Sequence, residues 1–251
     1  RYGIVWDVNR TTSLKAYARQ QRGFGERMRV SCETVLPINW KSFLRVDDNK
    51  TALFHFLANQ IYLIDVPNCK VIVTTLGENV LVNGTDLERA GLEPCNHEEA
   101  DTRMLLHCQH AYNQEARKLM CVATDTDVVV IAIASATRFI DCEAWIEFGH
   151  GKHKRYIPLH SITASLGQDK SLALPFFHAF SGCDTTSSFK GIGKKTAWDT
   201  WQVFPAATPV FMRLSCLSSH ITAEDFVILE RFTVLMYRRT SHLRTVNETR
   251  L

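Results

Sequence analysis

Acidic residues occur at four places along the chain in patterns that could hold metal ions. Two of these places directly follow apolar runs, and the other two are the stretches "NHEEADTR" and "SGCD". Concentrated carboxylates repel one another unless cations neutralise them, and hard oxygen donors favour Mg²⁺ or Mn²⁺ over zinc. Two such ions can activate a water and stabilise the leaving oxygen in phosphodiester cleavage. The candidate metal ligands are Asp7, Glu99, Asp101, Asp125, Asp127 and Asp184.

Each acid also has a purely structural interpretation. Asn96 would be an N-cap with Glu99 three residues on, Asp127 would cap the helix "VVVIAIAS", and Asp184 would cap a turn. On a regular helix, residues i and i+2 do not share a face. Glu99 and Asp101 can therefore reach the same metals only if Glu99 still belongs to the loop that enters the helix.

The elements that must position these acids alternate along the chain. Continuous apolar strands separated by helical patterns predict an α/β fold with a mostly parallel central sheet covered by helices on both faces. In such a sheet, ligands gather beyond the carboxyl ends of the strands, where Asp7, Asp125 and Asp127 fall. In an extended segment, Asp125 and Asp127 would point the same way. The predicted strands are "YGIVWDV", "IYLIDV", "KVIVTTL", "LMCVAT" and "CEAWIEF".

After about residue 165 the strand signal fades and three helical patterns follow. They are "SLALPFFHAFSGC", "KKTAWDTWQVF" and "TAEDFVILERFTVLMYRR", the last opening with Thr222 and Asp225 in a near capping box. We therefore predict two domains, an α/β core over residues 1–168 and a helical region over residues 169–251.

Basic residues are concentrated locally although the chain has a net charge of only +3. Lys15, Arg19 and Arg22 are spaced to share one face of a helix that begins soon after Asp7. Further basic groups occur at Lys190, Lys194 and Lys195. Such local charge favours a polyanionic partner, and the alternative is a solvated helix face.

Composition excludes several other classes of protein. No apolar run reaches the length of a membrane span, and the first residues lack the features of a signal peptide. The eight cysteines are scattered, so reduced thiols are favoured over disulfides. One group could suggest zinc, but it has no CxxC, and we expect no zinc there. Its members are Cys95, His97, His107, Cys108 and His110.

Taken in order, these parts resemble the flap endonuclease family of structure-specific 5′ nucleases, within the PIN-like superfamily. "VWDVNRTTSLKAYARQQRG" resembles that family's strand and Asp followed by the base of its helical arch, and "EAD" resembles its Glu-Ala-Glu motif. "TDTDVVV" is similar to its Asp-x-Asp motif. "FSGCDTTSSFKGIGKKTAWD" resembles its last metal-side Asp and the helix–two-turn–helix that grips duplex DNA. The resemblance covers roughly residues 2–200.

The resemblance implies a role for each matching residue. The six acids would hold two Mg²⁺ or Mn²⁺ ions, and Lys15 and Arg22 would steer the scissile phosphate and neutralise its developing charge. Gly191 and Gly193 would let backbone N–H groups approach a DNA phosphate. The remaining nucleic-acid contacts would come from Arg19, Lys190, Lys194 and Lys195. The family also implies an intracellular, nuclear protein of DNA repair.

Three departures from the family pattern keep other functions open. No acid precedes Asp7 where the family has one, so we expect a chain truncated at its N-terminus or a damaged site. Asp101 is one methylene shorter than the family's Glu, and no sliding-clamp peptide is present at the C-terminus. The alternatives are a PIN-like domain that binds nucleic acid or protein without cutting it, and a PIN-type RNase that cleaves single-stranded RNA.

Overall fold

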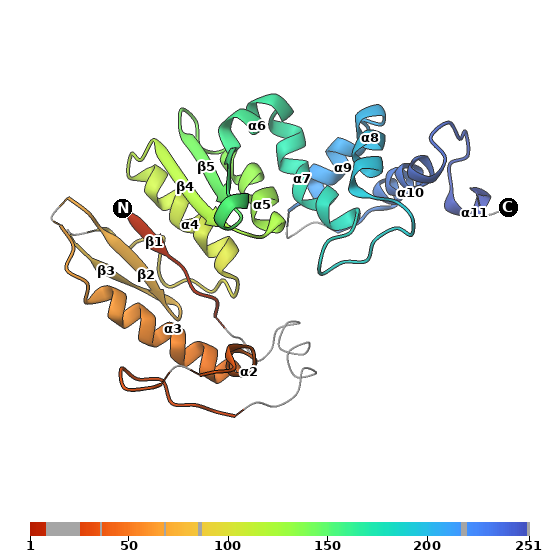
Figure 1. Ribbon diagram of the computed structural model, residues 1–251. Helices are drawn as coiled ribbons and strands as arrows, with labels where there is room; N and C mark the ends of the chain where they lie inside the picture. Colours follow the sequence, from red (N-terminus) through yellow and green to blue (C-terminus); the bar gives the residue numbers. More distant parts are fainter. Residues whose placement is uncertain (9–25, 36, 68, 85–86, 217–219, 250–251) are drawn as a thin grey trace. The chain divides into compact units, whose positions relative to one another are not determined.

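The computed structural model describes residues 1–8, 26–35, 37–67, 69–84, 87–216 and 220–249. The chain is an α/β protein that divides into two compact units, residues 1–114 and 115–251 (Figure 1). The division predicted from the sequence, after residue 168, lies within the second unit, where a helix begins at Gln168. Among the described helices, none has both the length and the apolar character that crossing a membrane requires.

The first unit contains a three-stranded mixed sheet in the order β1-β2-β3. The strands are β1 (Tyr2–Ile4), β2 (Ile72–Leu76) and β3 (Asn79–Asn83). Strand β1 runs parallel to β2, with Gly3 opposite Val73, whereas β3 returns antiparallel after a tight turn at Gly77. Val73, Val80 and Leu92 form a small buried core.

Two longer helices cover this sheet. The helices of the unit are α2 (Trp40–Leu44), α3 (Asp47–Tyr62) and α4 (Ala100–Asn113). Helix α3 packs against β2 and β3, and α4 contacts β1. The buried Arg103 of α4 donates to the backbone oxygens of Gly77 and Asn79, so α4 also secures the turn that joins β2 to β3.

The second unit begins with another three-stranded mixed sheet, in the order β4-β5-β6. Its strands are β4 (Lys118–Ala123), β5 (Glu143–Phe148) and β6 (Arg155–Pro158). Strands β4 and β5 are parallel, and β6 is antiparallel to β5 after the short 3₁₀ helix η1 (Gly151–His153). Helix α6 (Leu159–Leu166) packs on β5 and against α5 (Thr126–Ala136), which in turn packs against α7 (Gln168–Phe180).

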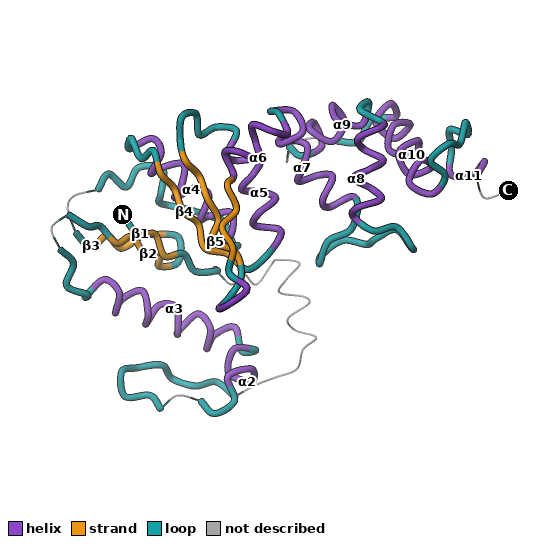
Figure 2. Tube along the Cα trace, turned by 45° about the horizontal axis from the view of Figure 1, so that its top comes forward, coloured by secondary structure: helices purple, strands orange, loops and turns teal. Residues whose placement is uncertain are grey.

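Beyond β6, the described chain consists of helices and loops alone (Figure 2). The later helices are α8 (Lys194–Val203), α9 (Ala207–Leu214), α10 (Ala223–Tyr237) and α11 (Val246–Thr249). Helices α7 to α10 share an aromatic core in which Phe177 stacks on Trp201 and Phe211 lies edge-on to Phe232. The predicted capping box at Thr222 is confirmed, because its side chain and that of Asp225 cap each other's backbone N–H.

One prediction about the strands was wrong, and the mostly parallel central sheet is not confirmed. Residues 61–66 are not a strand: α3 extends through Tyr62, and the apolar run "IYLIDV" continues that helix before the chain leaves it. In place of one mostly parallel central sheet, the described residues form two small mixed sheets. Strands β3 and β6, which were not predicted, each pair antiparallel with the strand before them across a short connection.

Candidate metal centre

In the second unit, the Asp-x-Asp pair stands where α5 begins, directly beyond the end of β4. Asp125 is the N-cap of the helix, and its Oδ1 accepts a hydrogen bond of 2.8 Å from the backbone N–H of Asp127. Asp127 already belongs to the first helical turn, so the two acids do not alternate along an extended segment as predicted, and the cap is Asp125 rather than Asp127. The positive end of the helix dipole favours both negative charges.

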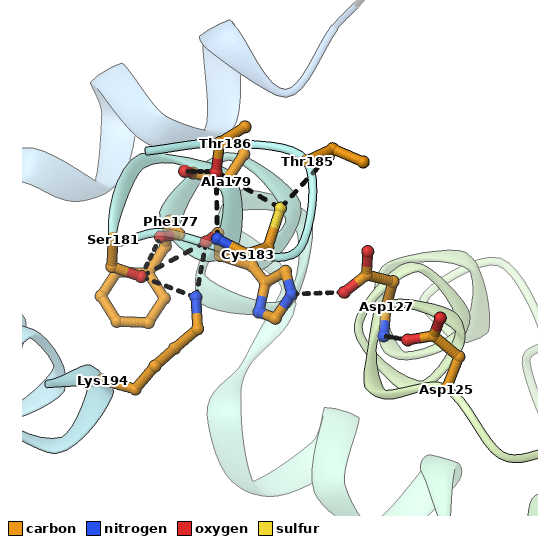
Figure 3. Close-up of polar contacts among 10 residues, drawn as sticks. Asp125, Asp127, Phe177, Ala179, Ser181, Cys183, Thr185, Thr186 and Lys194 are labelled. Carbon is orange, nitrogen blue, oxygen red and sulfur yellow. Dashed lines mark hydrogen bonds and ion pairs between the residues drawn. The ribbon is translucent and has the colours of Figure 1, made fainter. Parts of the chain in front are cut away.

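The structure brings a histidine and a cysteine of the same unit to Asp127. Helix α5 packs against α7, and His178 in the last turn of α7 lies with its Nε2 2.8 Å from Asp127 Oδ1. Cys183 follows in the loop after α7. One ligand atom from each of Asp127, His178 and Cys183 lies within 4.8 Å of the others (Figure 3).

The loop after α7 is fixed by local hydrogen bonds. Thr186 Oγ1 donates to the backbone oxygen of Ala179 at 2.7 Å and accepts from the backbone N–H of Cys183 at 3.0 Å. The Cys183 sulfur lies 3.5 Å from Thr185 Oγ1 and 3.3 Å from Thr186 Oγ1. Burial raises the pKa of the Cys183 thiol, but these hydrogen bonds lower it by more, so that the pKa falls below its ordinary value.

Lys194, the first residue of α8, ties the two ends of this loop together. Its Nζ donates to the backbone oxygen of His178 at 2.6 Å and lies 2.9 Å from Ser181 Oγ (Figure 3). Burial lowers the pKa of Lys194, while the nearby Cys183 and Asp127 raise it by less. In this structure the amino group is engaged by the protein, and its predicted contact with DNA stays a prediction.

The other residues predicted to act in this segment lie on the exposed side of the loop. Asp184 is exposed and is not a member of the Asp127, His178 and Cys183 group. Lys190 is exposed as well, and Gly191 has a positive φ of 75°. Gly193 is the N-cap of α8 and is exposed, so the N-terminus of that helix opens to solvent.

Lys195, in the first turn of α8, forms an ion pair of 2.6 Å with Asp199 one turn later. Its side chain is 87% exposed, so the pair contributes little to stability and the charge remains accessible.

In the first unit, Asp7 lies where α4 begins. Its Oδ1 accepts a hydrogen bond of 3.0 Å from the backbone N–H of Ala100, and its Oδ2 accepts from Lys50 Nζ at 3.0 Å. The next residue, Val8, donates its backbone N–H to the oxygen of Glu98 at 2.8 Å. The chain leaving β1 therefore runs beside the loop that carries the "HEEAD" stretch.

The predicted metal site requires Glu99 to belong to the loop that enters α4, and the structure meets this condition. Glu99 is the N-cap, with an extended backbone at φ −87° and ψ 131°, and Asp101 lies in the first turn. Glu99 therefore still belongs to the entering loop, and the N-cap is Glu99 rather than Asn96. Asp7, Glu99 and Asp101 thus come from two distant segments to one end of a helix.

Lys15, Arg19 and Arg22 lie outside the described residues, so the predicted basic helix face stays a prediction. Three side chains at the acids were not found from the sequence: Lys50, His178 and Cys183. The only local signal was that His178 and Cys183 lie five residues apart near the end of the predicted helical segment "SLALPFFHAFSGC", just before Asp184.

Comparison of the chain with protein-family models, with curated proteins and with solved structures finds no match.

Proposed function

We propose that this chain is a divalent-metal-dependent nuclease of the flap endonuclease type. It would hydrolyse phosphodiesters in flapped or branched DNA, with carboxylates as metal ligands. The PIN-like architecture implied by the sequence resemblance is part of the same proposal.

The observation that carries the proposal is the convergence of acids in the first unit. Asp7, from the segment after β1, accepts a hydrogen bond from Ala100 at the first residue of α4, where Glu99 and Asp101 stand. Three acids from segments more than 90 residues apart along the chain therefore stand at the start of one helix, although their ligand atoms are not yet close enough together to form a three-ligand group. Lys50 and the N-terminus of α4 offset part of this negative charge, and a divalent cation would neutralise it further.

The second unit repeats this pattern at the end of β4, where Asp125 and Asp127 share the start of α5. All of these donors are hard carboxylate oxygens, which fit Mg²⁺ or Mn²⁺. When bound, such ions supply an activated water and stabilise the charge on the leaving oxygen. The hydrogen bonds to Asp7 and Asp127 fix the direction of each carboxylate, as is common for metal ligands. The exposed N-terminus of α8, with Lys195, would hold the duplex backbone.

Cleavage of a 5′-labelled flap substrate in Mg²⁺ or Mn²⁺ tests the proposal. Asn is as good an N-cap as Asp, so Asp125→Asn removes the charge and keeps the cap of α5. We expect Asp7→Asn and Asp125→Asn each to lower the cleavage rate at least about a hundredfold, since ligand loss removes several kcal/mol of charge stabilisation. The matched control is Asp169→Asn, an exposed acid in the first turn of α7, which should cut normally. Cleavage that persists in Asp125→Asn would contradict the proposal.

One observation favours a second candidate, a domain that binds nucleic acid without cutting it. Two of the predicted metal ligands already have partners in the protein, since Asp7 pairs with Lys50 and Asp127 with His178. The same experiment separates the two candidates. Flap binding without cleavage in both Mg²⁺ and Mn²⁺ would support the second.

A further inference from the structure

The group of Asp127, His178 and Cys183 has a different chemistry from the carboxylate clusters. It offers one carboxylate, one imidazole and one thiol, from α5, the end of α7 and the loop that follows. Mg²⁺ does not select sulfur or imidazole ligands, whereas zinc-class ions bind all three donor types. From the sequence we predict Mg²⁺ or Mn²⁺ and no zinc, and the residues considered for zinc there are others, in the first unit.

The separations of these three donors suit one ion. Ligand distances of about 2.0 Å to nitrogen or oxygen and about 2.3 Å to sulfur place tetrahedral ligand atoms about 3.3–3.6 Å apart. The three ligand atoms already lie within 4.8 Å of one another, and His178 Nε2 is 2.8 Å from Asp127 Oδ1. Small side-chain rotations would therefore bring all three onto a common ion.

The backbone that carries the donors is held in place by other contacts. Lys194 fixes the end of α7 through the oxygen of His178, and Thr186 fixes the backbone of Cys183. The side chains remain reachable, because 14% of the His178 side chain and 35% of the Asp127 side chain are exposed. Donors on a fixed backbone with a path to solvent are what a metal site needs.

We propose that Asp127, His178 and Cys183 form a binding site for a zinc-class ion, Zn²⁺ or Co²⁺, with three protein ligands and a fourth position open to water or a ligand oxygen. Three protein ligands with one open position are the pattern of catalytic rather than purely structural zinc sites. The site does not rest on the proposed nuclease function.

Cobalt titration of the full, tag-free chain tests the site, because a Co²⁺–thiolate bond adds a charge-transfer absorption that oxygen and nitrogen ligands do not give. We expect one equivalent of Co²⁺ to produce this absorption and Zn²⁺ to abolish it by displacement. Cys183→Ser should remove the absorption, and His178→Gln should weaken Co²⁺ binding at least tenfold. The matched control is Cys216→Ser, an exposed cysteine of the same unit, which should bind Co²⁺ unchanged.

A second measurement on the unaltered chain does not depend on how the variants fold. Zn²⁺, but not Mg²⁺, should protect Cys183 from alkylation by iodoacetamide, as mapped by mass spectrometry, while Cys216 reacts in both. Thiolate absorption that persists in Cys183→Ser, or alkylation of Cys183 unaffected by Zn²⁺, would overturn the proposal. Asp127 is a proposed ligand in both cases, but both readouts are made without DNA and follow Cys183 and His178, so failure of this site and failure of the nuclease are distinguishable.

Discussion

At the scale of single residues, folding buries some polar side chains without giving them a hydrogen-bond partner, and His107 is one of them. It lies in α4 with 5% of its surface exposed, and neither ring nitrogen has a hydrogen-bond partner among the described residues. Burial lowers the pKa of His107 to about 3, and the positive charges of Arg1 and Arg103 add to this effect. The imidazole is therefore neutral in the folded protein at neutral pH.

His107 should make stability depend on pH. Unfolded His107 gains a proton near its ordinary pKa of 6.5, while the folded protein excludes it until about pH 3. The contribution of the neutral His107 to the free energy of unfolding is fully present above pH 6.5 and is lost as the pH falls toward 3. The free energy of unfolding should therefore drop by about 2 kcal/mol between pH 7 and pH 5. Urea unfolding at these two pH values measures it.

His107→Leu should remove most of that pH dependence, whereas His55→Gln, a change at an exposed histidine of α3, should retain it. An equal loss of stability on acidification in the His107→Leu protein would show that other groups carry the effect.

At the scale of elements, the loop between α7 and α8 is shaped by one glycine. Gly182 has φ +98°, and a Cβ there would lie 2.6 Å from the Cβ and 2.8 Å from the Cα of Ser188. The chain can therefore fold back on itself only if position 182 has no side chain. Because Cys183 is the next residue, this close approach also positions the proposed zinc-class site.

Gly182→Ala should be far more damaging than Gly191→Ala. Both glycines have positive φ, but a Cβ at Gly191 meets no atom within 4 Å, so only backbone strain of about 1–2 kcal/mol is expected there. At Gly182 a backbone clash adds about 1–3 kcal/mol. Urea unfolding of the two variants measures the difference. Equal destabilisation by the two variants would mean that the close approach to Ser188 does not stabilise the loop.

At the scale of the whole molecule, charge is unevenly divided between the two units. Residues 1–114 contain 13 Lys and Arg against 13 Asp and Glu, while residues 115–251 contain 16 against 13. The net charge of +3 therefore belongs to the second unit as a sum over its sequence. So small a net charge gives weak long-range attraction, and any grip on DNA must come from local contacts.

The proposed DNA contacts can be counted from the salt dependence of binding. Each lysine–phosphate contact contributes about 0.9 to the slope of log affinity against log salt concentration. Lys190→Ala combined with Lys195→Ala should lower the magnitude of that slope by about 2, measured on duplex DNA without divalent cations. Lys118→Ala, whose side chain is 80% exposed at the start of β4, is the control and should leave the slope unchanged. An unaltered slope in the double variant would exclude both lysines from the interface.

The sequence by itself determined the features that depend on near neighbours along the chain. Strands β2, β4 and β5, helices α7, α8 and α10, and the capping box at Thr222 follow from apolar periodicity and capping chemistry that span only a few residues. The sequence also identified the acids at the starts of α4 and α5 as candidate metal ligands.

Only the tertiary structure decided which strands pair and which side chains meet. The antiparallel strands β3 and β6, the Lys50–Asp7 ion pair and the meeting of Asp127 with His178 were not predicted. Lys50 and Asp7 are 43 residues apart along the chain, and His178 and Asp127 are 51 residues apart. Such contacts form because helices bury their apolar faces against neighbouring elements, and that packing fixes positions that no local pattern encodes.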